Sequence, residues 1–244
     1  MKLKWDEIQN KFNIGRVDVI KPVFSRSGLS EEKRIVASIA CLQGMGDFEN
    51  LEKMLMIVID TQDDLVKAYE LLLQGYLFCG YPIAIESFFC LGNAIKNNPD
   101  VSIKKISYKP LDSDDELLRR GDKCARKVHR DKWDLINNKI SDFCPDLGYL
   151  MIVEGYGHII SRDGLDLINR ELANVSSLTA LGAHRQLHSH IRGARNVGCE
   201  DEQIYETIVT TGLWVSSSKV KRSVDILSDI TGFSSGESID ILFS

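Results

Sequence analysis

Glu171 and His190 are the two residues of this 244-residue sequence whose types and spacing best fit acid/base chemistry. Glu171 stands 11 residues before Gly182 (182 − 171), and His190 stands 8 residues after it (190 − 182). If two antiparallel helices meet at Gly182, a rise of about 1.5 Å per residue puts the two residues about 16 and 12 Å from the turn. A carboxylate at that place would orient the imidazole, which titrates near neutrality. The spacing therefore predicts an acid/base pair.

The same spacing also fits a structural hydrogen bond between two helices, and an internal repeat helps to choose between the two interpretations. Residues 161–192 repeat residues 25–56 without a gap, at an offset of 136 (161 − 25). A duplicated scaffold keeps its core positions in both copies, so ionisable residues found in one copy only are better candidates for function. The shared residues are Ser25, Arg26, Gly28, Leu29, Arg34, Ala37, Leu42, Gly46 and Leu51, which recur as Ser161, Arg162, Gly164, Leu165, Arg170, Ala173, Leu178, Gly182 and Leu187.

Several positions carry an ionisable residue in the second copy only, and three of them are the candidates for function. Arg192 follows His190 by two residues, roughly 200° round a helix, so it points elsewhere on the subunit, in the direction of a neighbour. His188 lies one turn before Arg192 on that face. Arg170 recurs as Arg34, which favours a structural role for it. The three positions are Glu171, His190 and Arg192, and the first copy has Ile35, Met54 and Met56 there.

Metal binding and nucleophilic catalysis are the competing chemistries. His184 and His188 share a helix face, but His190 lies about 160° away from it, and no Cys or Asp cluster completes a ligand set. Cys199 near a helix start is the best nucleophile, yet no second cysteine is close to it in the sequence, and the six scattered cysteines fit buried, reduced thiols. Phosphate-binding and dinucleotide-binding motifs are absent, so we expect no metal and no cofactor.

The composition describes an acidic globular protein. Hydrophobic residues make up 43% of the chain, which supports a proper core, and a count of five prolines favours an all-α fold. The net charge of −5 argues against a nucleic-acid partner, and the basic run 119–130 is interleaved with Asp122. No apolar stretch resembles a signal peptide or reaches the roughly 18–20 residues that span a bilayer. We expect a cytoplasmic protein with no membrane contact.

Apolar spacing predicts the same order of helices in both copies. In the first copy a helix opens at Ser30 and ends at Gly44–Gly46, and helices follow at about 48–60, 63–79 and 82–96. In the second copy the helices are 165–181, 184–197, one opened by Asp201 and Glu202, and 218–231. A linker at 97–113 and a charged helix pair at 114–140 separate the copies.

Several stretches of the second half resemble the carboxymuconolactone decarboxylase family. Residues from about 114 to 230 resemble one complete subunit with its N-terminal arm, and residues 25–95 resemble a degenerate copy. The turn Gly80-Tyr81-Pro82 matches the family's small-aromatic-Pro turn better than residues 216–218 (Ser-Ser-Ser) do. The stretches are 155–165 (GYGHIISRDGL), 169–173 (NRELA), 178–182 (LTALG) and 186–198 (QLHSHIRGARNVG).

The resemblance implies an all-α fold that associates into trimers or hexameric rings, and it implies one of two chemistries. One branch, similar to alkylhydroperoxidase D, reduces peroxides with a C-x-x-C pair between a Glu and a His. Here the two cysteine positions are Ala183 and Gln186, so that chemistry is not expected. The other branch decarboxylates a carboxylated muconolactone, and its matching positions are Arg170, Glu171, His190 and Arg192.

The resemblance to the decarboxylases implies a role for each of these residues. In a cofactor-free site a cation holds the substrate carboxylate or stabilises enolate charge, and Arg170 or Arg192 would supply it. His190 would be the proton donor and Glu171 its orienter, with His188 as a further substrate-binding residue.

We therefore predict an all-α protein made of two tandem alkylhydroperoxidase D-like repeats that form an intrachain pseudo-dimer. Residues 1–105 would be the degenerate repeat and residues 106–244 the complete one. Three chains would form a homotrimer, a ring of six repeats. The expected function is a cofactor-independent lyase acting on a small carboxylated lactone or related organic acid. The alternatives are a non-catalytic small-acid-binding or assembly protein and, less favoured, a peroxidase-type relative.

Overall fold

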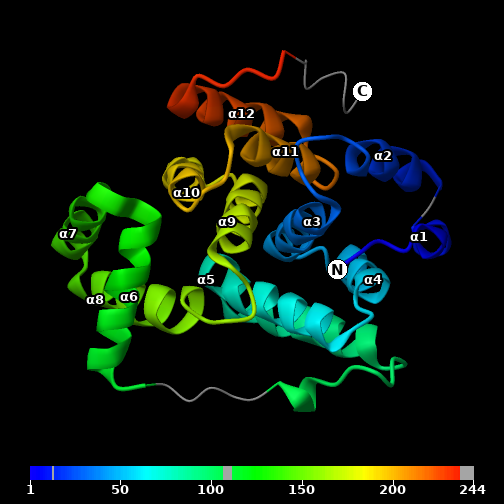
Figure 1. Cartoon of the computed structure of the whole chain (residues 1–244), viewed down its shortest axis with the longest axis horizontal. Helices are drawn as coiled ribbons and strands as arrows, with labels where there is room; N and C mark the ends of the chain where they lie inside the picture. The colour runs from blue at the N-terminus through cyan, green and yellow to red at the C-terminus, as the bar shows by residue number, and fades with distance from the viewer. Residues whose placement is uncertain (13, 107–111, 237–244) are drawn as a thin grey trace.

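A computed structural model describes residues 1–12, 14–106 and 112–236 of the chain, and within these residues it contains helices and no β-strand. The fold is all-α, as the sequence predicts. The helices are α1 (Trp5–Lys11), α2 (Ile14–Phe24), α3 (Glu31–Met45), α4 (Phe48–Val58), α5 (Gln62–Ile95), α6 (Asp114–His129), α7 (Trp133–Phe143), α8 (Pro145–Leu150), a π-helix (Met151–Ile160), α9 (Leu167–Leu181), α10 (His184–Asn196), α11 (Asp201–Thr211) and α12 (Ser217–Thr231), with short 3-10 turns at Ile103–Lys105 and Arg130–Lys132 (Figure 1).

Helices α3 and α9 pack against each other at the centre of the molecule (Figure 1). Each has 15 residues, and α9 starts 136 positions after α3 (167 − 31). Each ends at a glycine in the left-handed region, Gly46 with φ 67° and Gly182 with φ 71°. Glycine takes this conformation without a steric penalty, so each helix stops there and the chain reverses into α4 or α10.

Helix α5 bends where the sequence predicts a break between two helices. Gly80 has φ 78° and ψ 169° inside the 34-residue element, and Pro82 follows in the first turn of the second half. By length and composition α5 is the one helix among the described residues that could cross a membrane. That is weak support, because the core helix of a soluble protein passes the same test, and α5 buries the polar side chains Glu70 and Gln74.

Buried ion pairs join the two halves of the chain reciprocally. Glu70 of α5 binds two arginines of the second half, and Glu206 of α11 binds two arginines of the first half. Removing one partner of such a pair leaves an uncompensated buried charge, so these contacts hold the halves in register. The pairs are Arg162–Glu70 (2.8 Å), Arg170–Glu70 (2.9 Å), Arg26–Glu206 (2.7 Å) and Arg34–Glu206 (2.8 Å), and each residue of one set lies 136 positions from its counterpart.

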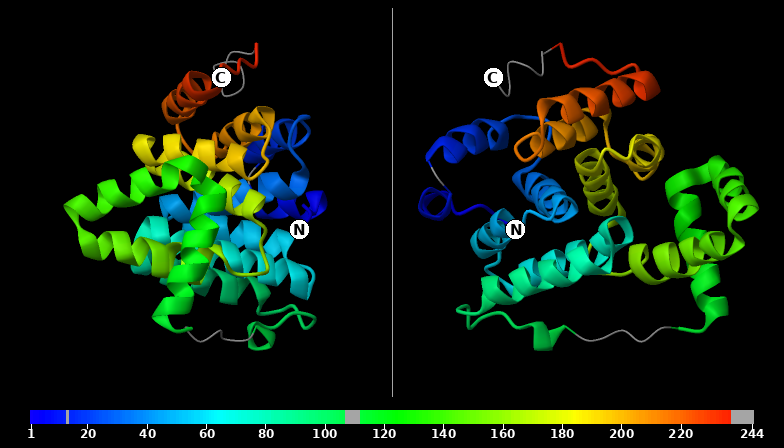
Figure 2. Two further views of the ribbon diagram at one scale, coloured as in Figure 1. Left: turned by 60° about the vertical axis from the view of Figure 1, so that its left-hand side comes forward. Right: turned by 180° about the vertical axis from the view of Figure 1, so that it is seen from behind.

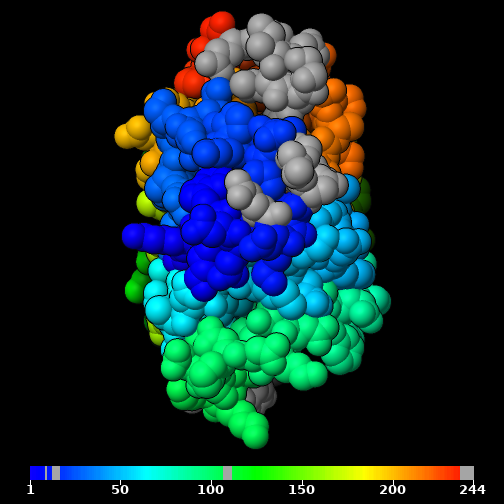
Figure 3. Space-filling model, turned by 90° about the vertical axis from the view of Figure 1, so that its right-hand side faces the viewer, coloured from blue at the N-terminus to red at the C-terminus, as the bar shows by residue number. Residues whose placement is uncertain are grey.

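Most apolar side chains form one core that draws on both predicted repeats, from Ile8 in α1 to Leu227 in α12. A smaller cluster lies beneath α6 and the π-helix, which cover α9 and α10 from one side (Figure 2). The N-terminal helices α1 and α2 cover the opposite side (Figure 3). The boundary between the two repeats at residue 105 stays a prediction. Residues 107–111, which belong to the predicted linker 97–113, lie outside the described part of the chain.

Candidate active site

Glu171 of α9 and His190 of α10 lie side by side, as their spacing about Gly182 predicts. Glu171 Oε2 is 2.9 Å from His190 Nδ1. The Glu171 side chain is fully buried, and His190 is 8% exposed. A carboxylate in this position accepts the Nδ1 proton and fixes the tautomer, so Nε2 is the ring atom that remains to accept or deliver a proton.

Gly193 gives Glu171 room to reach the histidine. A Cβ built on Gly193 would lie 2.6 Å from Glu171 Oε2 and 2.8 Å from Val128 Cγ1, both too close for a side chain. The matching residue of the first copy is Ile57 (193 − 136), which is fully buried. The second copy therefore has a carboxylate beside a glycine where the first copy packs apolar side chains.

A chain of buried hydrogen bonds leads from the interrepeat ion pair to the Glu171–His190 pair. Arg170 donates from Nη1 to Gln74 Oε1 (2.9 Å), and Gln74 Nε2 donates to Asn174 Oδ1 (2.5 Å). Asn174 Nδ2 in turn donates to Glu171 Oε1 (3.0 Å). Every member of this chain is buried, so its polar groups depend on one another for partners.

The first copy lacks the equivalent chain. Arg34 donates to Thr210 Oγ1 (3.0 Å), which is the counterpart of the Arg170–Gln74 bond (210 − 74 = 136). The counterpart of Asn174 is Ser38, whose buried hydroxyl has no hydrogen-bond partner among the described residues. Ile35 stands in the place of Glu171 and is buried in the core.

An aromatic layer from α6 and the π-helix covers the pair. The His129 ring lies 6.1 Å from the His190 ring, centre to centre, and stacks on Trp133. His129 Nε2 and Tyr156 Oη are 2.5 Å apart. Burial and the neighbouring His190 lower the pKa of His129 to about 4, and burial raises the pKa of Tyr156 well above its ordinary value. Both groups are therefore neutral near pH 7.

The sequence shows no partner for His129, and the predicted site residues do not include Gln74, Asn174 or Tyr156. Asn174 lies one helical turn after Glu171, and the matching residue of the first copy is Ser38. This difference between the copies was a signal that Asn174 belongs to the site. Gln74 and Phe78, whose ring lies 5.8 Å from that of His190, come from the first repeat. Their contribution follows from the packing of α5 on α9, which the linear pattern does not encode.

The structure does not bring the predicted arginines to His190. The guanidinium of Arg170 is buried and bonded to Glu70, Gln74 and the carbonyl oxygens of Leu165 and Arg162, so it has a structural role. Arg192 and His188 are exposed on the outer face of α10. Within one chain, neither of these two residues shares a site with Glu171.

The cysteines nearest the site are protonated thiols. Burial, with a smaller effect from Glu171, raises the pKa of Cys124 to about 11, and burial raises that of Cys199 to about 12. All six cysteines are free. Ala183 precedes α10 and Gln186 is exposed within it, in the positions where the peroxidase branch needs its thiols. No group of three or more His, Cys, Asp or Glu side chains suited to a metal was found among the described residues.

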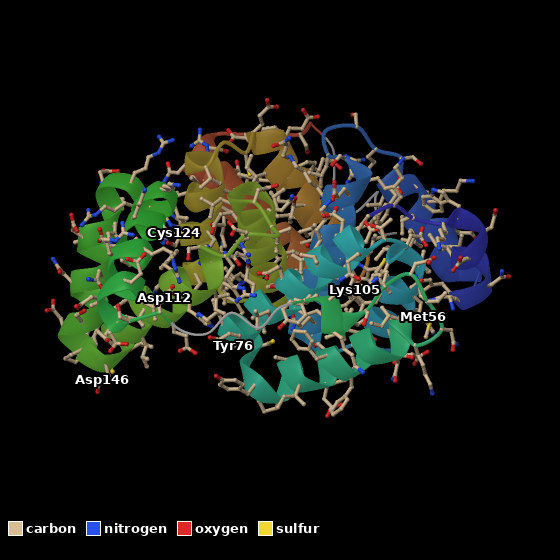
Figure 4. All side chains as sticks on the ribbon, turned by 60° about the horizontal axis from the view of Figure 1, so that its bottom comes forward. Met56, Tyr76, Lys105, Asp112, Cys124 and Asp146 are labelled. Carbon is tan, nitrogen blue, oxygen red and sulfur yellow. The ribbon has the colours of Figure 1, made fainter. Side chains whose placement is uncertain are left out.

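A surface cavity of about 630 Å³ lies on the outer side of α6, between this helix and the segment that precedes α9. Its wall includes the exposed Lys123 and Lys127, and its floor includes Cys124 and Leu167. Both floor residues also belong to the apolar cluster around Tyr156 and Trp133. Figure 4 shows Cys124 on α6, where this helix meets α9 and α10. Cys124 therefore lines the cavity and also lies close enough to Glu171 for that carboxylate to affect the pKa of its thiol.

Comparison with known proteins supports the resemblance. A curated relative, Peroxisomal protein 2 of Saccharomyces cerevisiae, is 24% identical over 106 residues, which are 43% of this chain. The match spans 38% of the length of that relative. Residues 149–229, which contain both Glu171 and His190, match the carboxymuconolactone decarboxylase family. The family resemblance is thus confirmed for this segment: residues 149–229 form a carboxymuconolactone decarboxylase family domain.

Proposed function

We propose that the chain is a cofactor-independent lyase of the carboxymuconolactone decarboxylase type, acting on a small carboxylated lactone or related organic acid. The observation that carries the proposal is the buried contact between Glu171 and His190, 2.9 Å long. Burial of a carboxylate is costly unless it is compensated, and the first copy folds with Ile35 and Met54 at these positions. The fold alone therefore does not require the pair, which favours a role in chemistry.

In the proposed reaction, loss of CO₂ breaks a carbon–carbon bond of the substrate and leaves the electron pair on the conjugated lactone as an enolate. His190 Nε2 delivers a proton to the carbon, and Glu171 stabilises the imidazolium before the transfer. Water restores the proton afterwards. The neutral state of His129 supports the role of His190 as proton donor. A protonated His190 then has no second positively charged imidazole beside it to repel it.

The arginine roles are revised in the proposal. Arg170 is a positioning residue that acts on Glu171 through Gln74 and Asn174. Arg192 makes no hydrogen bond or ion pair with another described residue, so its guanidinium is free for an anion or for a neighbouring subunit. We propose that Arg192 contributes to substrate binding only in an oligomer, where the Glu171–His190 site of a neighbouring subunit lies against α10.

The test is CO₂ release from a panel of carboxylated muconolactones and related lactone acids. His190→Ala and Glu171→Gln should each lower kcat by about 10²–10⁴-fold, the usual contribution of a positioned acid/base group. His188→Ala is the matched control, because it removes an exposed imidazole from the same helix. If the wild type decarboxylates one of these compounds and His190→Ala does so at the same rate, the proposal is rejected.

The alternative is a non-catalytic small-acid-binding or assembly protein. The observation that favours it is the aromatic cover over His190, which leaves only 8% of the residue exposed. In that case the panel would show binding without CO₂ release, and His190→Ala would change the affinity only. A peroxidase-type function has less support, because both thiol positions are occupied by other residues.

We also propose that the chain is an intrachain pseudo-dimer of two repeats. The reciprocal ion pairs of Glu70 and Glu206 support this, because contacts related by a twofold axis occur in such matched sets. The central contact between α3 and α9, which are equivalent helices, supports it as well.

A further inference from the structure

Two lysines line the cavity between α6 and the segment that precedes α9, which we call the α6 cavity, and they have no partner among the described residues. Lys123 and Lys127 are both exposed, and neither makes a hydrogen bond or an ion pair with another described residue. They lie four residues apart on one helix, which puts their Cβ atoms about 5–6 Å apart. The cavity volume of about 630 Å³ lies within the roughly 300–1,000 Å³ that is usual for small-molecule sites. Both ammonium groups can therefore reach one small ligand.

The other basic side chains of the α6 cavity already have carboxylate partners. A paired cation contributes little net field to the cavity, because the charge of its partner offsets it. Lys123 and Lys127 are thus the cations left for a ligand. The paired cations are Arg120 with Asp112 (2.6 Å), Arg162 with Glu70 (2.8 Å) and Lys67 with Glu32 (2.7 Å).

The α6 cavity is positive in a chain that is acidic as a whole. Five of its lining residues are Lys or Arg and three are Asp or Glu, a surplus of two positive charges (5 − 3), whereas the whole chain carries −5. One of these carboxylates, that of Asp166, caps α9 by accepting the backbone N–H of Asn169 (2.8 Å). A cleft with a surplus of one sign focuses the field and raises the local concentration of oppositely charged ligands. The cavity therefore attracts an anion.

The floor of the α6 cavity is apolar and uncharged. Cys124 is 6% exposed, and burial raises the pKa of its thiol to about 11, so the thiol is neutral near pH 7. Ile160, Leu165 and Leu167 also line the cavity. A hydrocarbon body on this floor gains about 25 cal/mol for each Å² of apolar surface that is removed from water. An inorganic anion has no such surface to bury, so the floor favours an organic acid.

We propose that the α6 cavity binds a small organic acid with an apolar body and two carboxylates, one for each of Lys123 and Lys127. Two unpaired ammonium groups are neutralised by two negative charges, whereas a single carboxylate leaves one of them without a partner. The spacing of the lysines fits a flexible dicarboxylate about as long as adipate. The flexible stem of lysine lets each ammonium group follow its carboxylate. Neither Glu171 nor His190 lines the cavity, so this inference does not depend on the proposed lyase activity.

The first test is isothermal titration calorimetry of the full chain with adipate at pH 7 and low ionic strength, where charge pairs are least screened. The wild type should bind one adipate per chain. Lys123→Gln and Lys127→Gln should each weaken binding about threefold, and the double variant about tenfold, because each change removes one exposed charge pair. Lys139→Gln is the matched control, since it removes an exposed lysine outside the cavity and should keep the wild-type affinity. No binding by the wild type, or unchanged affinity in the double variant, overturns the proposal.

Two further ligands separate the roles of charge and of the apolar body. Hexanoate keeps the hydrocarbon body but has a single carboxylate, and sulfate is a dianion without a hydrocarbon body. Hexanoate should bind about threefold more weakly than adipate, and sulfate at least about tenfold more weakly. Hexanoate binding as tightly as adipate would overturn the assignment of one carboxylate to each lysine. Sulfate binding as tightly as adipate would overturn the assignment of an organic acid.

His190→Ala tests whether the α6 cavity is the place where adipate binds. The variant should bind adipate with the wild-type affinity, because His190 does not line the cavity. A loss of affinity of about tenfold or more in His190→Ala would place adipate at the Glu171–His190 pair, and it would overturn the proposed site.

Discussion

Gln74 donates a hydrogen bond to Asn174 over 2.5 Å, and this bond links the two halves of the chain at the candidate site. Gln74 belongs to α5 in the first half, whereas Asn174 belongs to α9 in the second. On one side of the bond lies the buried Arg170–Glu70 ion pair, and on the other lies Glu171. The first half of the chain therefore takes part in the candidate site, because Gln74 holds Asn174, which in turn bonds to the carboxylate of Glu171.

Gln74→Thr installs the residue that the second copy has at the matching position, Thr210. The shorter side chain leaves Asn174 Oδ1 and an Arg170 N–H without partners, so we expect a loss of about 1–3 kcal/mol in unfolding free energy. We also expect kcat to fall with little change in KM, because Glu171 is less firmly placed. Denaturant unfolding and steady-state kinetics measure the two effects.

Gln43→Leu is the control for this variant, because Gln43 is also buried and donates to a backbone carbonyl, that of Leu72, rather than to a side chain of the chain from Arg170 to Glu171. It should lower stability without lowering kcat. An equal loss of kcat in both variants would mean that Gln74 acts through general stability only.

Gly193→Ala should damage the site through sterics alone. The added Cβ would lie 2.6 Å from Glu171 Oε2, so the carboxylate has to move away from His190. Overpacking of this kind costs about 1–3 kcal/mol of stability, and we expect kcat to fall at least tenfold. Gly92→Ala adds the same methyl group to α5, where nothing lies within 4 Å, and it should leave kcat unchanged. Wild-type activity of Gly193→Ala would contradict the proposed geometry.

Arg170→Met and Arg34→Met should both destabilise the protein by about 3–5 kcal/mol, because each leaves a buried glutamate without one of its partners. Only Arg170 bonds to Gln74, so only Arg170→Met should also lower the kcat of the fraction that remains folded. Thermal unfolding, followed by kinetics below the transition, separates the two effects. Equal kcat in the two variants would show that the hydrogen-bond chain does not reach the chemistry.

His129 should make the protein less stable in weak acid. Its pKa is about 4 in the folded chain against 6.5 for an unperturbed histidine, so between these values the unfolded chain binds a proton that the folded chain does not. Stability therefore falls as the pH falls through this window, by about 2 kcal/mol between pH 7 and pH 5 from this residue.

Urea midpoints of the wild type and His129→Leu at pH 7 and pH 5 measure this effect. The variant should lose less stability between the two pH values, whereas His184→Gln, at an exposed position, should behave as the wild type. An identical pH dependence in His129→Leu would place the titrating group elsewhere.

Much of the fold was predictable because the repeat marks its own elements. The glycines that end α3 and α9, the order of the helices and the bend of α5 at Gly80 all follow from local signals. The Glu171–His190 contact followed from counting residues about the Gly182 turn. These features depend on short-range geometry, which spacing in the sequence encodes directly.

The remaining parts of the site depend on tertiary packing. Tyr156 reaches His129 because the π-helix packs closely on α6, where Gly121 and Gly157 let the two backbones approach. Arg170 was a substrate-binding candidate until Glu70 and Gln74 proved to occupy its guanidinium. Spacing along one helix predicts neither contact, because each joins residues on different helices that only tertiary packing brings together.

The most direct test of the central claim is the incorporation of deuterium from D₂O into the product during a single turnover of a carboxylated muconolactone. If His190 delivers the proton, the wild type places one deuterium on a single carbon of the former enolate, in one stereochemical configuration. His190→Ala should then form product at least about a hundredfold more slowly. Product formation by His190→Ala at the wild-type rate, with the same stereochemistry, would contradict the account.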